Sequence, residues 1–209
     1  MSDTEESVRR GRGRRPAAEV RAGVLAAAAR LLFAEGIAAV TFDRVATAAG
    51  SSKMTLYKWW PSPGALAAEA YFATSEQILE FPDTGDIEAD LKSQLHAFVS
   101  LLTQDGAGPA IAGLIAAAQT DPDLARALSH SYSRPRRALA VRALERARER
   151  GQIRADFDVG IIIDQLWGAC YHRLLLPDAP LDADFADALV TNALHGATPP
   201  PLPGGSTAP

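Results

Sequence analysis

The sequence contains only one cysteine, Cys170, among its 209 residues. An intramolecular disulfide is therefore excluded, and a reducing compartment is favoured. The chain also lacks a charge-free apolar run long enough to span a membrane, and its N-terminus lacks the apolar stretch of a signal peptide. Together these absences predict a cytoplasmic protein with no membrane partner.

Catalytic and metal-binding patterns are absent as well. The four histidines, His96, His130, His172 and His195, show no paired ligand spacing. Ser129-His130-Ser131 has nucleophile residue types but no strand-turn-helix context. Cys170 lies among apolar neighbours and is expected to be a small buried side chain rather than a reactive thiol. We therefore expect no enzyme activity, no cofactor and no metal, although the pattern alone leaves open a metal site built from distant residues.

No segment alternates convincingly with the period of two that marks a strand, whereas helical periodicity is widespread, so the sequence predicts an all-α fold. Gly36 is expected to end the first helix in a Schellman motif, and Pro135 to kink or split a later one. Expected helices span residues 17–35, 62–80, 87–103, 109–119, 121–150, 159–176 and 182–195.

The stretch from Thr41 to Trp60 reads as two short helices joined by a tight turn at residues 49–51. Thr41 and Ser52 are expected to cap the two helices, and Gly50 to supply the left-handed residue that ends the first. Two helices joined by a turn that contains glycine form a helix-turn-helix, whose second helix fits the major groove of DNA. This stretch therefore predicts a DNA-binding unit.

Several short motifs occur together around this unit. They are Phe33-Ala34-Glu35-Gly36, Thr41, Val45-Ala46, Ala49-Gly50, Ser52-Lys53, Thr55-Leu56-Tyr57, Trp60-Pro61-Ser62 and Leu66. With them, residues 17–70 resemble the DNA-binding domain of the tetracycline-repressor (TetR) family of bacterial regulators. The pattern Arg150-Gly151-Gln152-Ile153-Arg154 resembles C-terminal domains of one branch of that family. Pro63-Gly64 stands where members often carry Lys-Glu, and the missing lysine removes one expected phosphate contact.

The resemblance implies that the second helix of the motif reads DNA. Tyr57 matches the position whose hydroxyl usually meets a phosphate, while Trp59 is expected either to shield the core or to contact DNA. Lys53 and Lys58 fit a solvated face as well, but their place on this helix favours DNA contact. The expected DNA-binding residues are Thr41, Ser51, Ser52, Lys53, Met54, Thr55, Tyr57, Lys58 and Trp59, together with Arg9, Arg10, Arg12, Arg14 and Arg15 in a basic arm.

Charge is divided unevenly along the chain. Residues 1–60 carry ten Lys/Arg and six Asp/Glu, a net charge of +4, whereas the remainder carries eleven and nineteen, a net charge of −8. A basic N-terminal part on an acidic remainder suits a DNA-binding protein. We expect a disordered basic arm at 1–16, the DNA-binding unit at 17–62, a helical effector-binding and dimerisation domain at 63–196, and a disordered tail at 197–209.

The C-terminal helices raise two expectations, each set against plain core packing. The resemblance implies a four-helix dimer interface made by residues 159–176 and 182–195 of each subunit, with Ile162, Leu166, Leu174 and Leu189 as candidate contacts. It also implies a small-molecule pocket. Candidate pocket residues are Phe98, Leu102, Ile115, Tyr132, Trp167 and Tyr171. Few charges fall on these apolar faces, which favours a largely apolar ligand.

The sequence thus predicts a ligand-responsive transcriptional regulator, expected to be a repressor. It would bind a palindromic double-stranded DNA operator as a homodimer and be released by a small-molecule effector that the sequence does not identify. The alternative is an all-helical protein-interaction module, or a ligand-independent regulator, with weakened DNA specificity.

Overall fold

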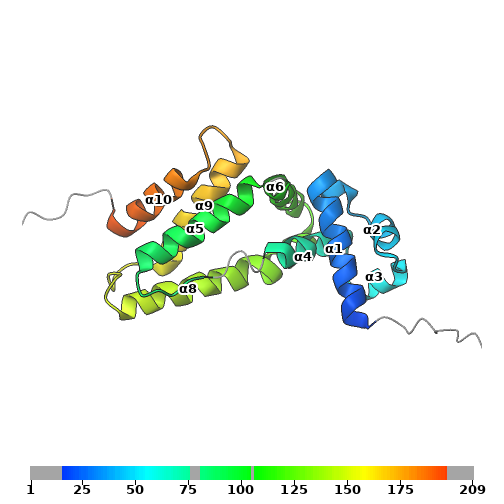
Figure 1. The fold of residues 1–209 in the computed structure, drawn as a ribbon, viewed down its shortest axis with the longest axis horizontal. Helices are drawn as coiled ribbons and strands as arrows, with labels where there is room; N and C mark the ends of the chain where they lie inside the picture. The colour runs from blue at the N-terminus through cyan, green and yellow to red at the C-terminus, as the bar shows by residue number, and fades with distance from the viewer. Residues whose placement is uncertain (1–15, 76–80, 105, 197–209) are drawn as a thin grey trace, which may run out of the picture.

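The computed structural model describes residues 16–75, 81–104 and 106–196, and within them the regular elements are helices, which confirms the all-α prediction. The molecule is elongated, with α1 (Ala17–Glu35), α2 (Phe42–Ala49) and α3 (Lys53–Trp59) at one end (Figure 1). At the other end lie α5 (Ile87–Thr103), α8 (Arg134–Glu149), α9 (Val159–Leu175) and α10 (Ala183–His195). Between the two ends lie α4 (Pro63–Ser75) and α6 (Ala107–Ala118), and α7 (Pro122–Leu128) packs against both.

Helices α1 to α3 form the helix-turn-helix unit, which has its own apolar centre. Val24, Val45 and Leu56, one from each helix, have no exposed surface. Burying an aliphatic side chain of this size contributes about 1.5–3 kcal/mol relative to leaving it in water. Burial of these three side chains therefore holds α2 and α3 against the longer α1. Helices as short as α2 and α3 would be only marginally stable in isolation.

The turn between α2 and α3 forms as predicted. Gly50 adopts a left-handed conformation at φ 60° and ψ 37°. The amide of Ser51 donates to the carbonyl of Ala46 at 3.0 Å, and the amide of Gly50 donates to that of Thr47 at 3.3 Å. This is the Schellman pattern, which satisfies the last carbonyls of a helix.

Gly36 differs from the prediction. It lies at φ 80° and ψ 179°, a region that is essentially restricted to glycine, so the expected Schellman ending does not form there. Its amide still donates to the carbonyl of Leu32 at 2.9 Å, and the chain then enters a 3₁₀ turn over Ile37–Ala39. The extended ψ turns the chain toward this short connector rather than closing it back on α1.

Helix α4 connects the two ends of the molecule. Ser62 caps it by accepting from the amide of Ala65 at 3.1 Å, with Pro63 at its first position as expected. α4 packs against α1 on one side and against α6 and α7 on the other. Ala67, Ala68 and Ala70 are fully or almost fully buried, and such small side chains allow the helix axes to approach closely.

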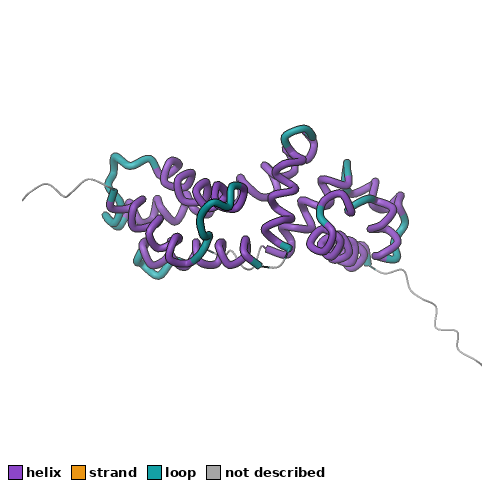
Figure 2. The backbone as a smooth tube through the Cα atoms, turned by 90° about the horizontal axis from the view of Figure 1, so that it is seen from above, coloured by secondary structure: helices purple, strands orange, loops and turns teal. Residues whose placement is uncertain are grey.

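The C-terminal body comprises α5 to α10, with α5 packed against α6, α8, α9 and α10. Seen from above, its described residues form helices and connecting loops (Figure 2). Leu91 and Leu95 of α5 have no exposed surface, and neither do Leu144 of α8 and Leu166 of α9. Among the described residues, no helix is both long and apolar enough to cross a membrane.

The long helix predicted for 121–150 is divided by a π-helical turn over Ser129–Ser133. Asp121 caps α7 with Pro122 next to it, and Pro135 lies in the first turn of α8, directly after the π-helical turn. A proline inside an α-helix removes one amide donor and clashes with the carbonyl four residues earlier. The backbone stays helical from α7 through the π-helical turn into α8, so the irregularity predicted at Pro135 is a local widening of the helix just before it rather than a break.

Candidate nucleic-acid interface and ligand cavity

The outer face of α3 carries exposed side chains. Met54 is 76% exposed and Tyr57 60%, while Leu56 between them has no exposed surface. Ser52, Lys53 and Lys58 are exposed, and Ser51, Thr55 and Trp59 are half-buried. The structure therefore places these residues on or beside one short helix, with one side directed to the core and the other to solvent.

Capping bonds fix the two polar residues that begin these helices. The Thr41 hydroxyl accepts from the amide of Arg44 at 3.2 Å and caps α2. The Ser52 hydroxyl accepts from the amide of Thr55 at 3.2 Å and lies 2.9 Å from the Thr55 hydroxyl. Both caps form as predicted, and both hydroxyl groups lie on exposed residues at helix N-termini, where amides and the helix dipole favour an anion such as a phosphate.

Tyr57 is held by an aromatic contact. Its ring meets that of the buried Phe42 edge-on, with centroids 4.6 Å apart and planes at 76°. Because Phe42 is 4% exposed and belongs to α2, it supports the base of Tyr57 while most of the side chain stays in solvent. The phenol is therefore presented from a fixed position.

Two acidic partners near this face were not foreseen from the sequence. Asp43 of α2 forms an ion pair with Lys53 of α3. Glu35, at the end of α1, accepts two hydrogen bonds from the Arg44 guanidinium at 2.7 and 3.0 Å, and these hold the pKa of Glu35 below its usual value. Lys53 would have to exchange a carboxylate for a phosphate on meeting DNA.

A second polar contact connects this unit to α4. The Trp60 indole N–H donates to Glu69 at 2.8 Å, and Arg21 of α1 pairs with the same carboxylate at 2.6 Å. The Arg21 guanidinium also lies 5.2 Å from the centre of the Trp60 ring. Trp59 packs edge-on against Trp60 at 5.6 Å and is half-buried. Glu69 thus links α1, the end of α3 and α4 through one carboxylate.

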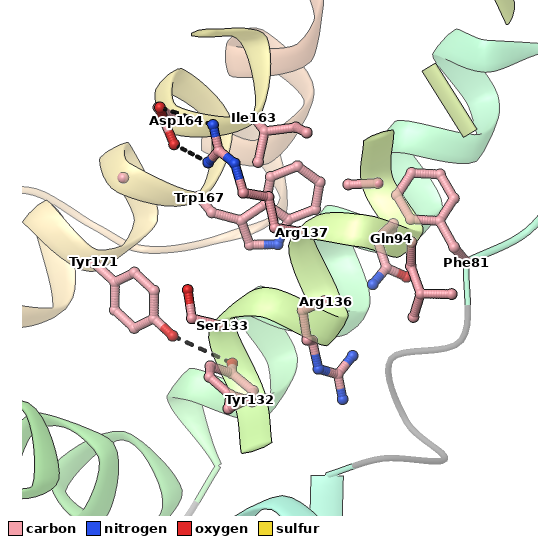
Figure 3. A pocket seen from close by; sticks show the side chains of 13 residues that line it. Phe81, Gln94, Tyr132, Ser133, Arg136, Arg137, Ile163, Asp164, Trp167 and Tyr171 are labelled. Atoms are coloured by element: carbon pink, nitrogen blue, oxygen red, sulfur yellow. Dashed lines mark hydrogen bonds and ion pairs between the residues drawn. The ribbon is translucent and has the colours of Figure 1, made fainter. Parts of the chain in front are cut away.

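The body contains a cavity of about 350 Å³ between α5, α8 and α9 (Figure 3). Aromatic rings supply much of its wall. It is lined by Phe81, Gln94, Tyr132, Ser133, Arg136, Arg137, Leu139, Ala140, Ile163, Asp164, Trp167, Gly168 and Tyr171. A concave, largely apolar space with a few converging polar groups is the usual form of a small-molecule site.

Two tyrosines meet in this wall. The hydroxyl groups of Tyr132 and Tyr171 lie 3.2 Å apart, and Figure 3 shows them facing each other from the π-helical turn and α9. Burial raises the pKa of both phenols, that of Tyr171 well above its ordinary value. Both groups are therefore neutral at physiological pH, and each can donate a hydrogen bond.

The same wall carries charge. Arg137 binds Asp164 through both of its terminal nitrogens and also donates to the carbonyl of Gly160 at 3.1 Å. Arg136, one residue earlier, lies 5.5 Å from the centre of the Tyr132 ring. The cavity is therefore not wholly apolar, because the first turn of α8 brings two guanidinium groups to its lining, and the expectation of a largely apolar ligand stays a prediction.

Three of the six candidate pocket residues, Tyr132, Trp167 and Tyr171, line this cavity, and the other three lie elsewhere. Phe98 and Leu102 of α5 are 1% and 3% exposed and belong to the core, with the Phe98 ring edge-on behind Tyr171 at 5.5 Å. Ile115 of α6 packs against the same core. Tyr132 and Arg136 are four residues apart, a helical spacing that was the available signal for the missed arginine.

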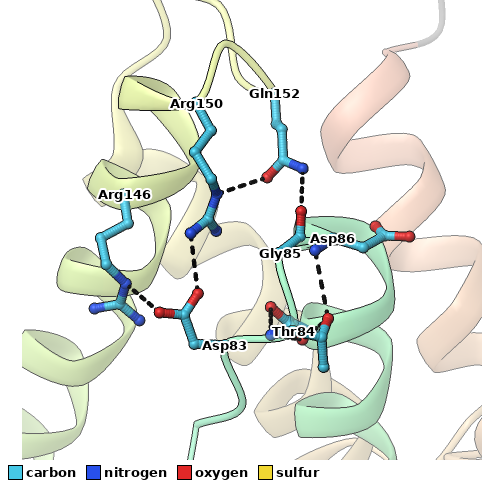
Figure 4. A network of polar contacts seen from close by, with 8 residues as sticks. Asp83, Thr84, Gly85, Asp86, Arg146, Arg150 and Gln152 are labelled. Carbon is cyan, nitrogen blue, oxygen red and sulfur yellow. Dashed lines mark hydrogen bonds and ion pairs between the residues drawn. The ribbon is translucent and has the colours of Figure 1, made fainter.

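The loop that carries Phe81 is held by a polar network (Figure 4). Asp83 binds Arg146 at 2.8 Å and Arg150 at 3.1 Å, both at the end of α8. Thr84 donates from its amide and its hydroxyl to Asp90 of α5, a carboxylate that is only 2% exposed. This loop, and with it one wall of the cavity, is therefore fixed to α8 and α5.

Two of the candidate dimer contacts are corrected by the structure. Ile162 and Leu166 are 2% and 0% exposed inside a single subunit, so their side chains are not available to a partner. Leu174 and Leu189 are half-buried against the same core. The exposed large apolar side chains of this region are Ile161, Leu175 and Leu176. The periodicity identified apolar helices but placed two core residues on an exposed face.

The remaining candidates carry no site in the described residues. No group of three or more His, Cys, Asp or Glu side chains in that part of the chain could hold a metal ion. Cys170 is buried, and burial raises the pKa of its thiol to about 12. The five arginines of the expected basic arm, Arg9, Arg10, Arg12, Arg14 and Arg15, lie outside the described residues, as does the expected tail.

Comparisons with known proteins agree with this architecture. Residues 24–70 match the family model described as bacterial regulatory proteins, tetR family, and residues 81–193 match that described as tetracyclin repressor-like, C-terminal domain. The HTH-type transcriptional regulator YdeS of Bacillus subtilis is 34% identical over 173 residues, which cover 83% of this chain and 87% of that protein. The DNA-binding transcriptional repressor TetR of Mycobacteroides abscessus is 30% identical over 183 residues, which cover 83% of this chain and 90% of that protein.

A solved structure supports the same conclusion. The TetR family transcription regulator SCO0332 is 57% identical, with a TM-score of 0.79, covering 87% of this chain and all of that one. The fold is thus that of a helix-turn-helix DNA-binding protein with a helical C-terminal domain. The chain belongs to the TetR family of bacterial transcriptional regulators, which are DNA-binding proteins and not enzymes.

Proposed function

We propose that this regulator is a repressor that binds a palindromic operator as a homodimer and leaves it when a small molecule occupies the cavity. The exposed polar face of α3, with Lys53, Tyr57 and Lys58 beside the capped N-terminus at Ser52, is the observation that carries the proposal. In this assignment residues 17–62 bind DNA in the cytoplasm, while residues 63–196 bind the effector and dimerise. The repressor named TetR in Mycobacteroides abscessus, 30% identical, favours repression.

The contacts with DNA divide by chemistry. Lys53, Lys58, Tyr57 and the capping hydroxyl groups of Thr41 and Ser52 suit phosphates, which position a protein on the duplex. Met54 is the most exposed large apolar side chain of the chain's described part, and such a group suits the methyl group of thymine. Ser51, Thr55 and Trp59 lie at the edge of this face, and the basic arm with its five arginines is assigned to the minor groove or to phosphates.

Dimerisation is assigned to the outer faces of α9 and α10. Ile161, Leu175 and Leu176 are 54%, 44% and 58% exposed there, at helical spacing on and just beyond α9. The half-buried Leu174 and Leu189 would border such an interface. A two-fold dimer would place two copies of α3 on successive major grooves, with half-site centres roughly 34 Å apart.

Ring contacts provide a route from the cavity to the DNA-binding end. Tyr132 stacks on Phe72 of α4, with centroids 4.3 Å apart and planes at 9°. Tyr71, the neighbour of Phe72 in sequence, packs edge-on against Phe33 of α1 at 5.9 Å. A ligand that displaces Tyr132 would therefore shift α4 and α1 together. Coupling of this kind amounts to about 1–3 kcal/mol in typical regulators.

The test is a titration of the DNA upstream of its own gene with the full-length protein. Binding is monitored by fluorescence anisotropy of the labelled DNA at several salt concentrations. We expect operator affinity to fall steeply with salt, because each neutralised phosphate releases counterions. Tyr57→Phe and Lys53→Ala should weaken operator binding without lowering the unfolding temperature, and Lys92→Ala, a change in α5 of the body, is the matched control. Equal affinity for operator and random DNA would contradict the proposal.

A further inference from the structure

We propose that the cavity between α5, α8 and α9 selects a flat aromatic ligand without net charge, that is, one or two fused rings carrying a hydroxyl group. The hydroxyl group would meet the phenols of Tyr132 and Tyr171, with the rings between Trp167 and the apolar wall. This inference rests on the proposed function, because it names the chemical class of the effector for the same cavity.

The flat walls of the cavity favour a flat ligand. Trp167 and Tyr171 of α9 and Tyr132 of the π-helical turn all border it. Two of these rings are fixed from behind, Tyr132 by the stacked Phe72 at 4.3 Å and Tyr171 by Phe98 at 5.5 Å. Aromatic walls held in this way offer stacked and edge-on contacts to a ring, and such contacts contribute more than the area they bury.

The size of the cavity limits the ligand. Its volume of about 350 Å³ is at the lower end of the range found for small-molecule sites. One or two fused rings match that volume. A long alkyl chain needs an extended channel, whereas most of the walls of this cavity come from neighbouring turns at the start of α8 and along α9. The shape therefore favours a compact ring system over a linear chain.

The charged side chains of the wall are already engaged. Within the described residues they are Arg136, Arg137 and Asp164. Arg137 binds Asp164 through both of its terminal nitrogens. Arg136 lies 5.5 Å from the centre of the Tyr132 ring, and its guanidinium is not a free cation. A charged ligand would therefore have to compete with contacts that the protein makes on its own.

This engagement disfavours a ligand of either sign. An anion would have to take Arg137 from Asp164, which leaves a carboxylate without its counter-charge, or take Arg136 from its present contacts. A cation would meet two guanidinium groups and one carboxylate that is already bound. Burying an ionised group without an available opposite charge costs far more than burying a hydroxyl group that is hydrogen-bonded. The wall therefore favours a neutral ligand.

The two phenols offer a neutral hydroxyl group its polar contacts. The oxygens of Tyr132 and Tyr171 lie 3.2 Å apart and face each other in Figure 3. This distance exceeds the usual range of about 2.5–3.0 Å for such a bond, so the bond is weak. Each hydroxyl group can donate one hydrogen bond and accept others. A ligand hydroxyl group could therefore accept from one phenol and donate to the other, replacing one weak bond by two.

The experiment uses isothermal calorimetry of the full-length protein with four probes. The first three, 2-naphthol, the anion 2-naphthoate and the cation 2-naphthylmethylammonium, share one ring system and differ in charge. The fourth, 1-decanol, is neutral but linear. We expect 2-naphthol to bind at least about tenfold more tightly than each of the others, because a buried charge or the ordering of a flexible chain costs at least that much. Equal or tighter binding of any other probe, or binding of none, would overturn the assignment of ligand class.

Tyr171→Phe tests the contact with the phenols. It removes one hydroxyl group of the pair and should weaken binding of 2-naphthol about two- to tenfold, the contribution of one neutral hydrogen bond. Tyr71→Phe is the matched control, because Tyr71 packs edge-on against Tyr132 at 6.4 Å but is not among the side chains that line the cavity. It should leave this affinity unchanged. Thermal unfolding of both variants separates a loss of recognition from a loss of fold. Equal affinities in the two variants would show that the phenol pair does not bind the ligand hydroxyl group.

Operator release is measured separately with the same probes, so the two proposals fail in different ways. If 2-naphthol binds with the expected preference but leaves operator affinity unchanged, the ligand class stands and ligand-induced release is wrong. If 2-naphthoate or the ammonium probe binds more tightly than 2-naphthol and also releases DNA, release stands and the assignment to neutral aromatic ligands is wrong.

Discussion

The helix-turn-helix unit and the C-terminal body organise their polar contacts over different distances along the chain. In the unit, the capping bonds of Thr41 and Ser52 join residues three apart, and the pair of Glu35 with Arg44 joins residues nine apart. In the body, the contact between Tyr132 and Tyr171 spans 39 residues, and that between Arg150 and Asp83 spans 67. The DNA-binding face is thus built from local contacts and the cavity from distant ones.

This difference has a consequence for function. Single substitutions on the exposed face of α3 change the chemistry of that face, while the buried residues that hold the helix stay in place. A cavity made from four separated segments depends on how α5, α8 and α9 pack, so its shape responds to substitutions far from its wall. The four tests that follow probe this comparison.

Removing a core side chain from each region gives the largest expected effect. Leu56→Ala in α3 and Leu144→Ala in α8 each delete a side chain with no exposed surface, and each should lower the free energy of unfolding by about 2–5 kcal/mol. Urea titration measures this loss. If the two regions are separable, Leu56→Ala should abolish operator binding and spare the proposed dimerisation through the body, measured by light scattering, while Leu144→Ala should weaken both. Loss of both activities in Leu56→Ala would show that the regions fold as one unit.

The junction between the regions is tested next by Gly106→Ala. Gly106 has φ 79°, and a β-carbon there would lie 2.5 Å from the carbonyl oxygen of Phe33 at the end of α1. Strain of this kind costs about 1–3 kcal/mol, and the clash would also push α6 away from α1. Calorimetric unfolding should show a lower midpoint. Gly168→Ala, at a helical glycine with open space around it, is the control and should not lower the midpoint.

A smaller loss is expected at the shared carboxylate of α4. Glu69→Ala leaves the Trp60 indole N–H, on a side chain that is 3% exposed, without its acceptor. The expected loss is about 1–2 kcal/mol. Glu69→Gln keeps an oxygen for Trp60 and removes only the ion pair with Arg21, so its loss should be at most about 1 kcal/mol. Equal losses in the two variants would mean that the indole bond contributes nothing.

The smallest effect concerns the exposed pair of Glu35 with Arg44. Hydrogen bonds from Arg44 hold the pKa of Glu35 below its usual 4.5, so the pair stabilises the folded protein above that pH and ceases to do so as the pH falls through the folded value. Near neutral pH the wild-type protein should therefore unfold at a slightly higher temperature than the Glu35→Gln variant. This difference in unfolding temperature should disappear at acidic pH. A gap that persists at the lowest pH would rule out the ionised carboxylate as its source.

Much of the fold could be predicted from the sequence because its signals are local. The caps at Thr41 and Ser52, the left-handed Gly50 and the prolines at helix starts each depend on a few neighbouring residues. Because α3 is a single short helix, its exposed residues could also be predicted from local sequence alone. The Schellman ending predicted at Gly36 was the exception among these local signals. The extended ψ of Gly36 depends on the direction in which the chain continues into the following 3₁₀ turn, which the residues of α1 do not determine.

The cavity was only partly predictable because helical periodicity reports apolar faces, not which faces meet. It selected Phe98 and Leu102, which lie in the core behind the wall, and it missed the charged residues at the start of α8. Ile162 and Leu166 failed as dimer contacts for the same reason. On a helix that is apolar on several sides, the pattern does not distinguish the side facing its own subunit from the side facing solvent.

The π-helical turn over Ser129–Ser133 has a consequence for chain length. It amounts to one residue added to an otherwise continuous helix, and each residue of an α-helix turns the chain by about 100°. Without that residue, α7 would be rotated by this angle relative to α8. Leu124 of α7, which packs against Gly64 at the start of α4, would then turn away from α4 if Tyr132 kept its place opposite Tyr171. A homologue one residue shorter at this point would retain one of these two contacts, but not both.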